Sequence, residues 1–345
     1  MEHILNTRMK YSNDLRLVIV SPCYNEEFVI AESSAKLSGV IDNLIEKGKI
    51  SSDSIILFVN DGSTDHTWDE IVKAHLLSSR VCGVNMAMNV GHQSAIMAGM
   101  MISRNLADAI ITIDSDLQDD INAIERMIDK YREGADVVYG VKNDRTIDPW
   151  YKRMMASLFY NVQRFLGVKT IKNHADFRLL SRQALDTLAS YPERNVFLRG
   201  LIPLMGYDVI MVDDVLSPRT NGESKFTINK QIHLAIDGIT SFTTKPLEHI
   251  FVGGVVMMII AFMMLVYVTV SLIIGHVIAG WASLMLSIWF IGAILTMGVG
   301  LIGIYIGKMY LEIKQRPMYR ISKSIGLQLD EEDNNDEILE KFNQL

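Results

Sequence analysis

The sequence predicts an α/β domain with a mostly parallel sheet, followed by two membrane-spanning helices. Apolar runs rich in β-branched residues alternate with helical patterns over residues 17–132. This alternation is typical of a parallel sheet that is covered by helices on both faces. Two long runs without any charged residue follow near the C-terminus. Each run exceeds the roughly 20 residues that a helix needs to cross a bilayer.

Five strands are predicted, each followed by a polar or glycine-containing turn. They cover residues 17–20, 55–59, 81–86, 109–113 and 137–139. Helices are predicted between them, at residues 27–47, 64–78, 93–105 and 121–132. Ligands of such sheets bind beyond the carboxyl ends of the strands. We therefore expect the chemistry in the turns that follow the strands.

The uncharged runs cover residues 250–274 and 281–307, and only GHVIAG separates them. Such a short connection predicts an antiparallel hairpin. Lys and Arg are absent from the connection but occur outside both runs, at Lys225, Lys230, Lys245, Lys308, Lys314, Arg316, Arg320 and Lys323. The positive-inside rule then predicts a multi-pass protein of the cytoplasmic membrane. Its α/β domain (1–225) and its tail (308–345) are both expected in the cytoplasm.

Residues 226–249 join the predicted domain to the first span. Phe226, Ile232, Ile236, Ile239 and Phe242 recur there at near-helical spacing. This spacing predicts amphipathic helices that lie in the membrane interface. A helix that packs against the α/β domain would give the same pattern, so both interpretations stay open.

Composition excludes some classes of function. The chain has 345 residues and a net charge of −7, which argues against nucleic-acid binding through phosphate contacts. Its two cysteines, Cys23 and Cys82, form no metal-binding spacing and are expected to be reduced thiols. The N-terminus has no apolar run of signal-peptide length.

The strongest chemical signal follows the fourth predicted strand. Asp114 and Asp116 stand at its carboxyl end, and residues i and i+2 of a strand point the same way. Two carboxylates side by side suit Mg²⁺ or Mn²⁺, with phosphate oxygens completing the coordination shell. Asp119 or Asp120 could instead cap the next helix. Capping and metal binding can coexist in this segment.

Two further turns are polar in the same way. In VSPCYNEE (20–27), Pro22 ends the first strand before Asn25 and Glu26. In FVNDGSTD (58–65), Asp61 follows the second strand and Gly62 permits a tight turn. Either turn alone is explained by turn and cap chemistry. Three polar turns at the ends of three strands indicate one shared site.

These motifs resemble family 2 glycosyltransferases with the GT-A fold. The resemblance rests on PCYNE, NDGSTD, MNVGHQSAIMAG, DSDLQDD, ADFRLLSR (175–182), FLRG (197–200) and RTNGESKF (219–226). With two C-terminal spans, the chain looks like the polyprenyl-phosphate glycosyltransferases, which include bactoprenol glucosyltransferases and dolichol-phosphate mannose synthases. The resemblance covers about residues 16–320. Asp120 departs from it, because many relatives have Pro there.

The resemblance implies roles for residues of the first four turns. It implies that the nucleoside is surrounded by Pro22, Tyr24, Asn25 and Glu26, and that Asp61 contacts the base or ribose. It also implies that the metal and diphosphate are held by Asp114, Asp116 and Gln118, with Ser115 between the two carboxylates. His92 and His174 have no recognised metal-ligand spacing, so structural hydrogen bonding is the expected role of both.

The resemblance also implies an anion-binding group in the second half of the domain. Arg178 and Arg199 would meet the acceptor phosphate or the donor diphosphate, because arginine binds phosphate bidentately. Arg219, Ser224 and Lys225 would close over them, and Arg145 and Arg153 are weaker candidates. Structural salt bridges are the alternative for each of the charged side chains. Asp176 matches the position of a catalytic base or orienting group.

The implied reaction is the inverting transfer of a hexose from a nucleotide sugar, first of all UDP-glucose, to polyprenyl (undecaprenyl) phosphate. The product would be a polyprenyl-phosphate sugar for modification of cell-envelope glycans. A GDP-mannose-dependent polyprenyl-phosphate mannose synthase is one alternative. A non-catalytic membrane scaffold with a degenerate GT-A fold is another. A processive polysaccharide synthase is disfavoured, because the chain has no QxxRW motif. We also expect a homo-oligomer.

Overall fold

The computed structural model describes residues 14–141, 174–194, 196–214 and 280–327, together with scattered residues between 247 and 274. The predicted interfacial helices (226–249) lie almost wholly outside the described residues. The described residues belong to two compact units. One contains the sheet and the segment from Arg316 onward, and the other contains the long C-terminal helix.

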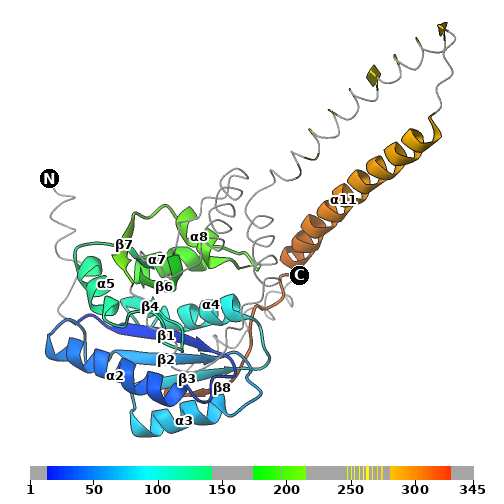
Figure 1. Ribbon diagram of the computed structural model, residues 1–345. Coiled ribbons are helices and arrows are strands. Elements are labelled where there is room, and N and C mark those ends of the chain that lie inside the picture. Colours follow the sequence, from blue (N-terminus) through cyan, green and yellow to red (C-terminus); the bar gives the residue numbers. More distant parts are fainter. Residues whose placement is uncertain are drawn as a thin grey trace, which may run out of the picture. The chain divides into compact units, whose positions relative to one another are not determined.

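The first unit contains an eight-stranded sheet in the order β7-β5-β6-β4-β1-β2-β3-β8 (Figure 1). Its strands are β1 (Leu17–Cys23), β2 (Ile55–Asn60), β3 (Val81–Met86), β4 (Ala109–Thr112), β5 (Val137–Val141), β6 (His174–Ser181), β7 (Val209–Asp213) and β8 (Ile321–Ile325). The strands β1 to β4 pair in parallel, whereas β6 and β8 run antiparallel to their neighbours. The five predicted strands and the mostly parallel sheet are confirmed.

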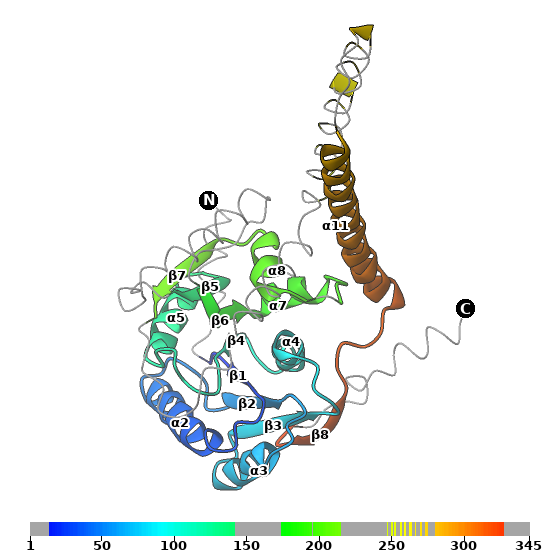
Figure 2. The ribbon, with the colours of Figure 1, turned by 45° about the vertical axis from the view of Figure 1, so that its right-hand side comes forward.

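Helices cover both faces of the sheet. The helices α2 (Ile30–Glu46), α3 (Thr67–Leu77) and α5 (Ala123–Arg132) contribute to one hydrophobic core, and α4 (His92–Ser103) lies over the other face (Figure 2). The helix α7 (Arg182–Ala189) packs beside α4. Every residue of β1 is buried, as expected for a strand with helices on both of its faces.

The order of the strands creates a switch point beside β1. The chain runs from β1 through β2 to β3 on one side of β1, and then returns to β4 on its other side. In sheets of this kind, ligands bind beyond the carboxyl ends of the strands at the switch point, here β1 and β4. The turn after β1 begins at Tyr24, and the turn after β4 contains Asp114 and Asp116.

Three strands that the alternation did not predict, β6, β7 and β8, complete this sheet. The strand β6 pairs antiparallel with β4, so that its first residues lie at the edge where β4 ends. The strand β8 pairs antiparallel with β3 and follows the long C-terminal helix in sequence. Residues 321–325 were expected in a separate tail, and instead they form an edge strand of the sheet.

The second unit contains α11 (Trp281–Lys314). Its segment Phe290–Lys314 contains an 18-residue stretch with a mean hydropathy of 2.0 and is long and apolar enough to cross a membrane. Among the described residues, it is the single candidate span. The second predicted span (281–307) falls within α11. The first predicted span (250–274) lies largely outside the described residues, so the prediction of two spans is not confirmed.

Candidate active site

The turns after β1 and β2 are joined by hydrogen bonds. Asn25 adopts a left-handed conformation, with φ of 55°, and its Oδ1 accepts from the backbone N–H of Thr64 at 2.9 Å. Its own N–H donates to Ser63 Oγ at 2.9 Å. The next N–H, of Glu26, donates to Thr67 Oγ1 at 2.8 Å. Motifs almost 40 residues apart therefore form one rigid edge of the site.

Asp61 holds the loop that precedes α4. Its Oδ1 accepts from the N–H of Val90 at 2.7 Å, and its Oδ2 accepts from the N–H of Gly91 at 3.0 Å. The Asn89 side chain donates to the same carboxylate at 3.1 Å. Burial raises the pKa of Asp61, although these backbone N–H groups oppose the increase. Asp61 thus fixes the start of α4, and its contact with a base or ribose stays a prediction.

The turn after β4 carries the acidic pair. Leu117 adopts a left-handed conformation, with φ of 46°, which is unfavourable for a branched side chain. Its N–H donates to the carbonyl of Asp114 at 3.1 Å. Ser115 is buried, and its carbonyl accepts from Ser33 Oγ in α2. The strained turn is therefore held by α2 through Ser33, while the Asp114 and Asp116 side chains are partly exposed.

Negative charge accumulates around Asp114. Burial raises the pKa of this carboxyl group to about 6, and the charges of Asp176, Asp119 and Asp116 add to the increase, whereas His92 opposes it. The side chain is nevertheless 47% exposed, so solvent moderates the effect of burial. A bound cation would relieve this repulsion, and the oxygen ligands suit a hard divalent metal.

Asp176 is the centre of a cluster of hydrogen-bond donors from three elements. It stands on β6 and is 7% exposed. Arg178 of the same strand donates to its Oδ1, and Arg199 Nη2 of α8 (Leu198–Leu204) lies 3.2 Å from its Oδ2. From the start of α4, His92 Nε2 and Gln93 Nε2 each lie 3.4 Å from Oδ2.

These neighbours determine the ionisation of Asp176. Burial alone would raise the pKa of Asp176, but Arg178, the hydrogen bond from His92 and the charge of Arg199 together hold that pKa well below its usual range. Burial lowers the pKa of His92 and the charge of Arg199 adds to that, but the hydrogen bond to Asp176 and the charges of Asp114 and Asp176 outweigh both and raise it. Asp176 is therefore ionised at neutral pH and is a weak proton acceptor.

The two arginines of this cluster differ in access. Arg178 is completely buried, and its guanidinium carbon lies 5.6 Å from the centroid of the Tyr139 ring on β5. Arg199 keeps 34% of its side chain exposed. Arg199 can therefore meet a bound anion directly, whereas Arg178 acts on Asp176 and Tyr139.

The structure places the other predicted residues unevenly. Pro22 is buried within β1, and Tyr24 is 40% exposed. The side-chain nitrogen Nε2 of Gln118 is buried without a hydrogen-bond partner in the described structure. Among the described residues, no group of three or more His, Cys, Asp and Glu side chains is arranged as a metal site. A cation would therefore need oxygens from the bound diphosphate. Several predicted positions lie outside the described residues: Arg145, Arg153, Arg219, Ser224, Lys225 and the His174 side chain.

Sequence reasoning missed the contacts of His92, Gln93 and Tyr139. Their contact with the cluster depends on β6, whose antiparallel position carries no local signal. The only available signal was the place of His92 and Gln93 directly after a glycine, at the start of a helix. Asp120, the departure from the family pattern, accepts a hydrogen bond from the N–H of Asn122 at 3.0 Å and shapes the approach to α5.

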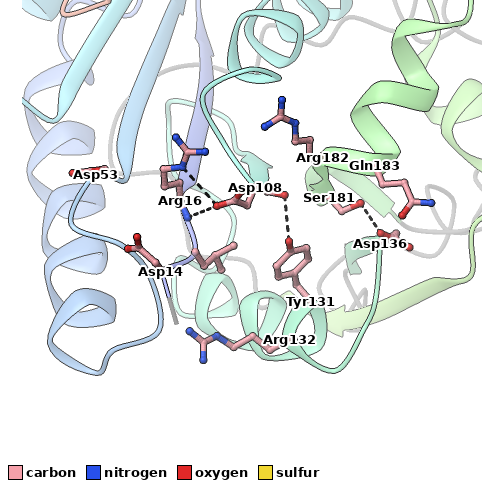
Figure 3. A pocket seen from close by; sticks show the side chains of 11 residues that line it. Asp14, Arg16, Asp53, Asp108, Tyr131, Arg132, Asp136, Ser181, Arg182 and Gln183 are labelled. Carbon is pink, nitrogen blue, oxygen red and sulfur yellow. Dashed lines mark hydrogen bonds and ion pairs between the residues drawn. The ribbon is translucent and has the colours of Figure 1, made fainter. Parts of the chain in front are cut away.

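A cavity of about 470 Å³ lies elsewhere, at the edge of the sheet where the parallel strands begin (Figure 3). Asp108 is engaged there by Arg16 and Tyr131, and Asp136 accepts from Ser181 at 2.6 Å. The carboxylates of Asp108 and Asp136 therefore already have hydrogen-bond partners. None of the predicted site residues lines the cavity. This cavity is separate from the candidate site.

Comparisons with known proteins agree with the motif series. The profile of Glycosyl transferase family 2 matches residues 18–189. The uncharacterized glycosyltransferase YkoT of Bacillus subtilis is 44% identical, over 91% of this chain and 93% of its own length. The SfII prophage-derived bactoprenol glucosyl transferase of Shigella flexneri is 38% identical, over 78% and 87%. Among solved structures, glucosyl-3-phosphoglycerate synthase of Mycobacterium tuberculosis has a TM-score of 0.42 at 13% identity, covering 66% of this chain and 76% of that one.

Proposed function

Because the chain belongs to glycosyl transferase family 2 and is a hexosyltransferase, we propose that it transfers glucose from UDP-glucose to the phosphate of a polyprenyl lipid such as undecaprenyl phosphate. The names of relatives that act on bactoprenol support the lipid acceptor. The observation that carries the proposal is the meeting, at one edge of the sheet, of an acidic turn and an arginine cluster.

The acidic turn is suited to stabilising the leaving group, the nucleoside diphosphate. Asp114 and Asp116, with the Gln118 amide nearby in sequence, would hold Mg²⁺ or Mn²⁺ against the diphosphate of the donor. When bound, the cation supplies positive charge that stabilises the departing nucleoside diphosphate. The raised pKa of Asp114 supports this assignment, since burial and the neighbouring carboxylates both disfavour its negative charge before a cation binds.

The arginine cluster suits the phosphate groups. Arg199 is partly exposed beside Asp176, and its guanidinium can bind a phosphate through two hydrogen bonds. Arg178 is buried against Asp176, so its role is to hold that carboxylate in place. Arg219, Ser224 and Lys225 remain proposed partners of the same phosphates.

The proposed chemistry is a single displacement. An oxygen of the lipid phosphate attacks the anomeric carbon, a new carbon–oxygen bond forms, and the bond to the diphosphate breaks as UDP leaves. The configuration at that carbon is inverted. A phosphate monoester has a second pKa near 6 and is already largely ionised at pH 7. Asp176 therefore need not accept a proton, and its low pKa suits an orienting role.

Attachment to a membrane would bring the two substrates together. The apolar helix α11 is long enough to cross a bilayer, and a polyprenyl phosphate cannot leave the bilayer. Holding the domain near the lipid headgroup removes most of the entropic cost of a bimolecular encounter. We propose a cytoplasmic active site that faces the headgroup layer.

The test is transfer by the purified full chain in lipid vesicles. Undecaprenyl phosphate and Mn²⁺ would be supplied with labelled UDP-glucose, with a second labelled UDP-hexose, or with GDP-mannose. We expect the unchanged protein to form a lipid-linked product from UDP-glucose, and the Asp116→Ala variant to form none. Product formed only from GDP-mannose would show that the donor is GDP-mannose and not UDP-glucose. An equal amount of product in excess chelator would contradict the proposed metal requirement.

A further inference from the structure

We infer that His92 and Gln93, the first two residues of α4, bridge the cation-binding and anion-binding halves of the active site. The inference rests on the proposed function. The cation-binding half is the turn with Asp114 and Asp116, and the anion-binding half is Arg199 with its partner Asp176. Both bridging side chains are positioning residues, because their contacts are to other side chains and to backbone.

His92 joins the two carboxylates. Its Nε2 lies 3.4 Å from Asp176 Oδ2 and 3.7 Å from Asp114 Oδ1. The first distance is that of a long hydrogen bond and the second that of an ion pair. One ring nitrogen thus spans the end of β4 and the beginning of β6, and limits how far Asp114 can turn from Asp176.

Gln93 joins Asp176 to the helix that carries Arg199. Its Nε2 donates to Asp176 Oδ2 at 3.4 Å, and its Oε1 accepts from the N–H of Leu198 at 3.2 Å. Leu198 is the first residue of α8, where backbone N–H groups have no partner within the helix. Gln93 therefore fixes the start of α8, one residue before Arg199.

The start of α4, which carries His92 and Gln93, is held in place on two sides. The loop before α4 is held by Asp61 through the N–H groups of Val90 and Gly91. At Gly99, a Cβ atom would lie 2.3 Å from Val20 Cγ1, so that α4 packs very closely on β1. Side chains that are fixed in this way can set the distance between the acidic turn and the cluster around Asp176.

The two contacts predict two separable defects, measured on the full chain in detergent. His92→Leu should raise about tenfold the Mn²⁺ concentration that gives half-maximal UDP binding, since it removes the contacts that position Asp114 relative to Asp176. His92→Gln, whose amide reaches a similar distance, should stay within about threefold of the unchanged protein. The matched control is His66→Leu, because His66 also starts a helix beside an aspartate, at 3.1 Å from Asp69, and is 79% exposed.

Gln93→Leu should raise the KM for undecaprenyl phosphate about fivefold and leave the Mn²⁺ requirement unchanged. Gln183→Leu is its control, since Gln183 is an exposed residue in the first turn of α7. Thermal unfolding of each variant shows whether it is folded. If His92→Leu does not fold, His92→Asn replaces it, because the shorter amide cannot span both carboxylates.

Equal Mn²⁺ requirements of His92→Leu and His92→Gln would overturn the bridge, and so would a Gln93→Leu variant that changes the metal requirement but not the acceptor KM. The proposed function fails differently. If the unchanged protein binds UDP with Mn²⁺ but glucosylates no polyprenyl phosphate, the acceptor is wrong, and the UDP titration still decides the role of His92. If neither UDP nor GDP binds in a metal-dependent way, both proposals are overturned.

Discussion

Arg178 donates a hydrogen bond to the carboxylate of Asp176, two residues earlier on β6, and both side chains are buried. Alternate residues of a strand lie on the same face, so the pair is formed within a single strand. Its partners come from elsewhere: Tyr139 lies under the Arg178 guanidinium, and Arg199 and the start of α4 approach Asp176. The pair therefore organises the half of the site that is proposed to bind anions.

Replacing Arg178 with Ala should lower both stability and transfer. The change leaves Asp176 buried without its closest cation, and breaking a buried pair in this way costs about 3–5 kcal/mol. Arg178→Lys should recover part of the stability, because it keeps the charge but not the planar donor group. Chemical unfolding followed by Trp fluorescence, together with glucose transfer, measures both effects.

Arg182→Ala is the control for this change. Arg182 directly follows β6, is exposed and lines the separate cavity of Figure 3. Its replacement should alter the free energy of unfolding by no more than about 0.5 kcal/mol. An Arg178→Ala variant as stable as Arg182→Ala would show that Asp176 does not need its buried partner.

Asp114→Asn should stabilise the metal-free protein above pH 6 and abolish metal-dependent nucleotide binding. The pKa of Asp114 is about 6 in the folded state and 3.8 for the unperturbed group. Between these values the unfolded chain loses its proton first, so the free energy of unfolding falls as pH rises, and the penalty is complete above pH 6. Because the side chain is 47% exposed, solvent screening reduces the gain from Asn to about 1 kcal/mol.

The stability difference should shrink as pH falls from 7 to below the unperturbed pKa of 3.8, where both states keep the proton. Metal binding should weaken over the same range, because the cation competes with the proton. Differential scanning calorimetry in chelator and titration with Mn²⁺ and UDP measure the two effects. The control Asp42→Asn, at an exposed ion pair with Arg80, should give no gain. A metal-free Asp114→Asn variant less stable than the unchanged protein at pH 7.5 would refute the explanation.

The sequence allowed the parallel half of the sheet to be predicted, because β1 to β5 are short apolar runs with helical patterns between them. It did not predict β6, where the charged Asp176 and Arg178 interrupt the apolar residues of the buried strand. The strand β8 (ISKSI) is partly polar, and it is stabilised by pairing with β3, more than 200 residues away. Neither strand has a local signal.

The same distinction applies to the candidate site. Asp114, Asp116 and Asp61 were found because they follow predicted strands. The roles of His92 and Gln93 were not found, because both contact Asp176 only where antiparallel β6 meets the start of α4. Arg178 was expected to meet a phosphate, and its complete burial now favours a supporting role. Burial of a charged side chain is decided by tertiary packing, which a motif does not report.

Gly62→Ala should disrupt the loop that Asp61 holds. Gly62 has φ of 63°, and a Cβ atom there would lie 2.5 Å from the carbonyl carbon of Met88 and 2.6 Å from the N of Asn89. The backbone must move away, which would break the hydrogen bonds from the loop to Asp61. Gly48→Ala is a matched control, because Gly48 has φ of 64° and no atom within 4 Å of its Cβ position.

Gly48→Ala should cost about 1 kcal/mol, the cost of the left-handed conformation alone. Gly62→Ala should cost at least about 2 kcal/mol more, since backbone rather than a flexible side chain obstructs the new atom. It should also weaken UDP binding, because α4 loses its fixed start. Equal unfolding free energies for the two variants would mean that the loop adapts to the added methyl group.

Truncation should distinguish β8 from the residues that follow it. The backbone N–H of Ala87 donates to the Arg320 carbonyl at 2.8 Å, and Asn85 Nδ2 lies 3.1 Å from Ser322 Oγ. Cys82 Sγ lies 3.4 Å from the Gly326 carbonyl. Ending the chain at Gln315 keeps α11 but removes these contacts and leaves β3 as an open edge that favours aggregation. Ending it after Leu327 keeps β8 entire.

We expect the chain that ends at Leu327 to bind UDP and unfold like the full chain. The chain that ends at Gln315 should unfold at a lower temperature and aggregate, because the loop that begins at Ala87 leads directly into the Asp61 contacts and α4. Size-exclusion chromatography in detergent and thermal unfolding compare the two on equal terms, since both retain α11. Identical behaviour of the two chains would mean that β8 is dispensable and that Asp61 alone is enough to hold the loop before α4.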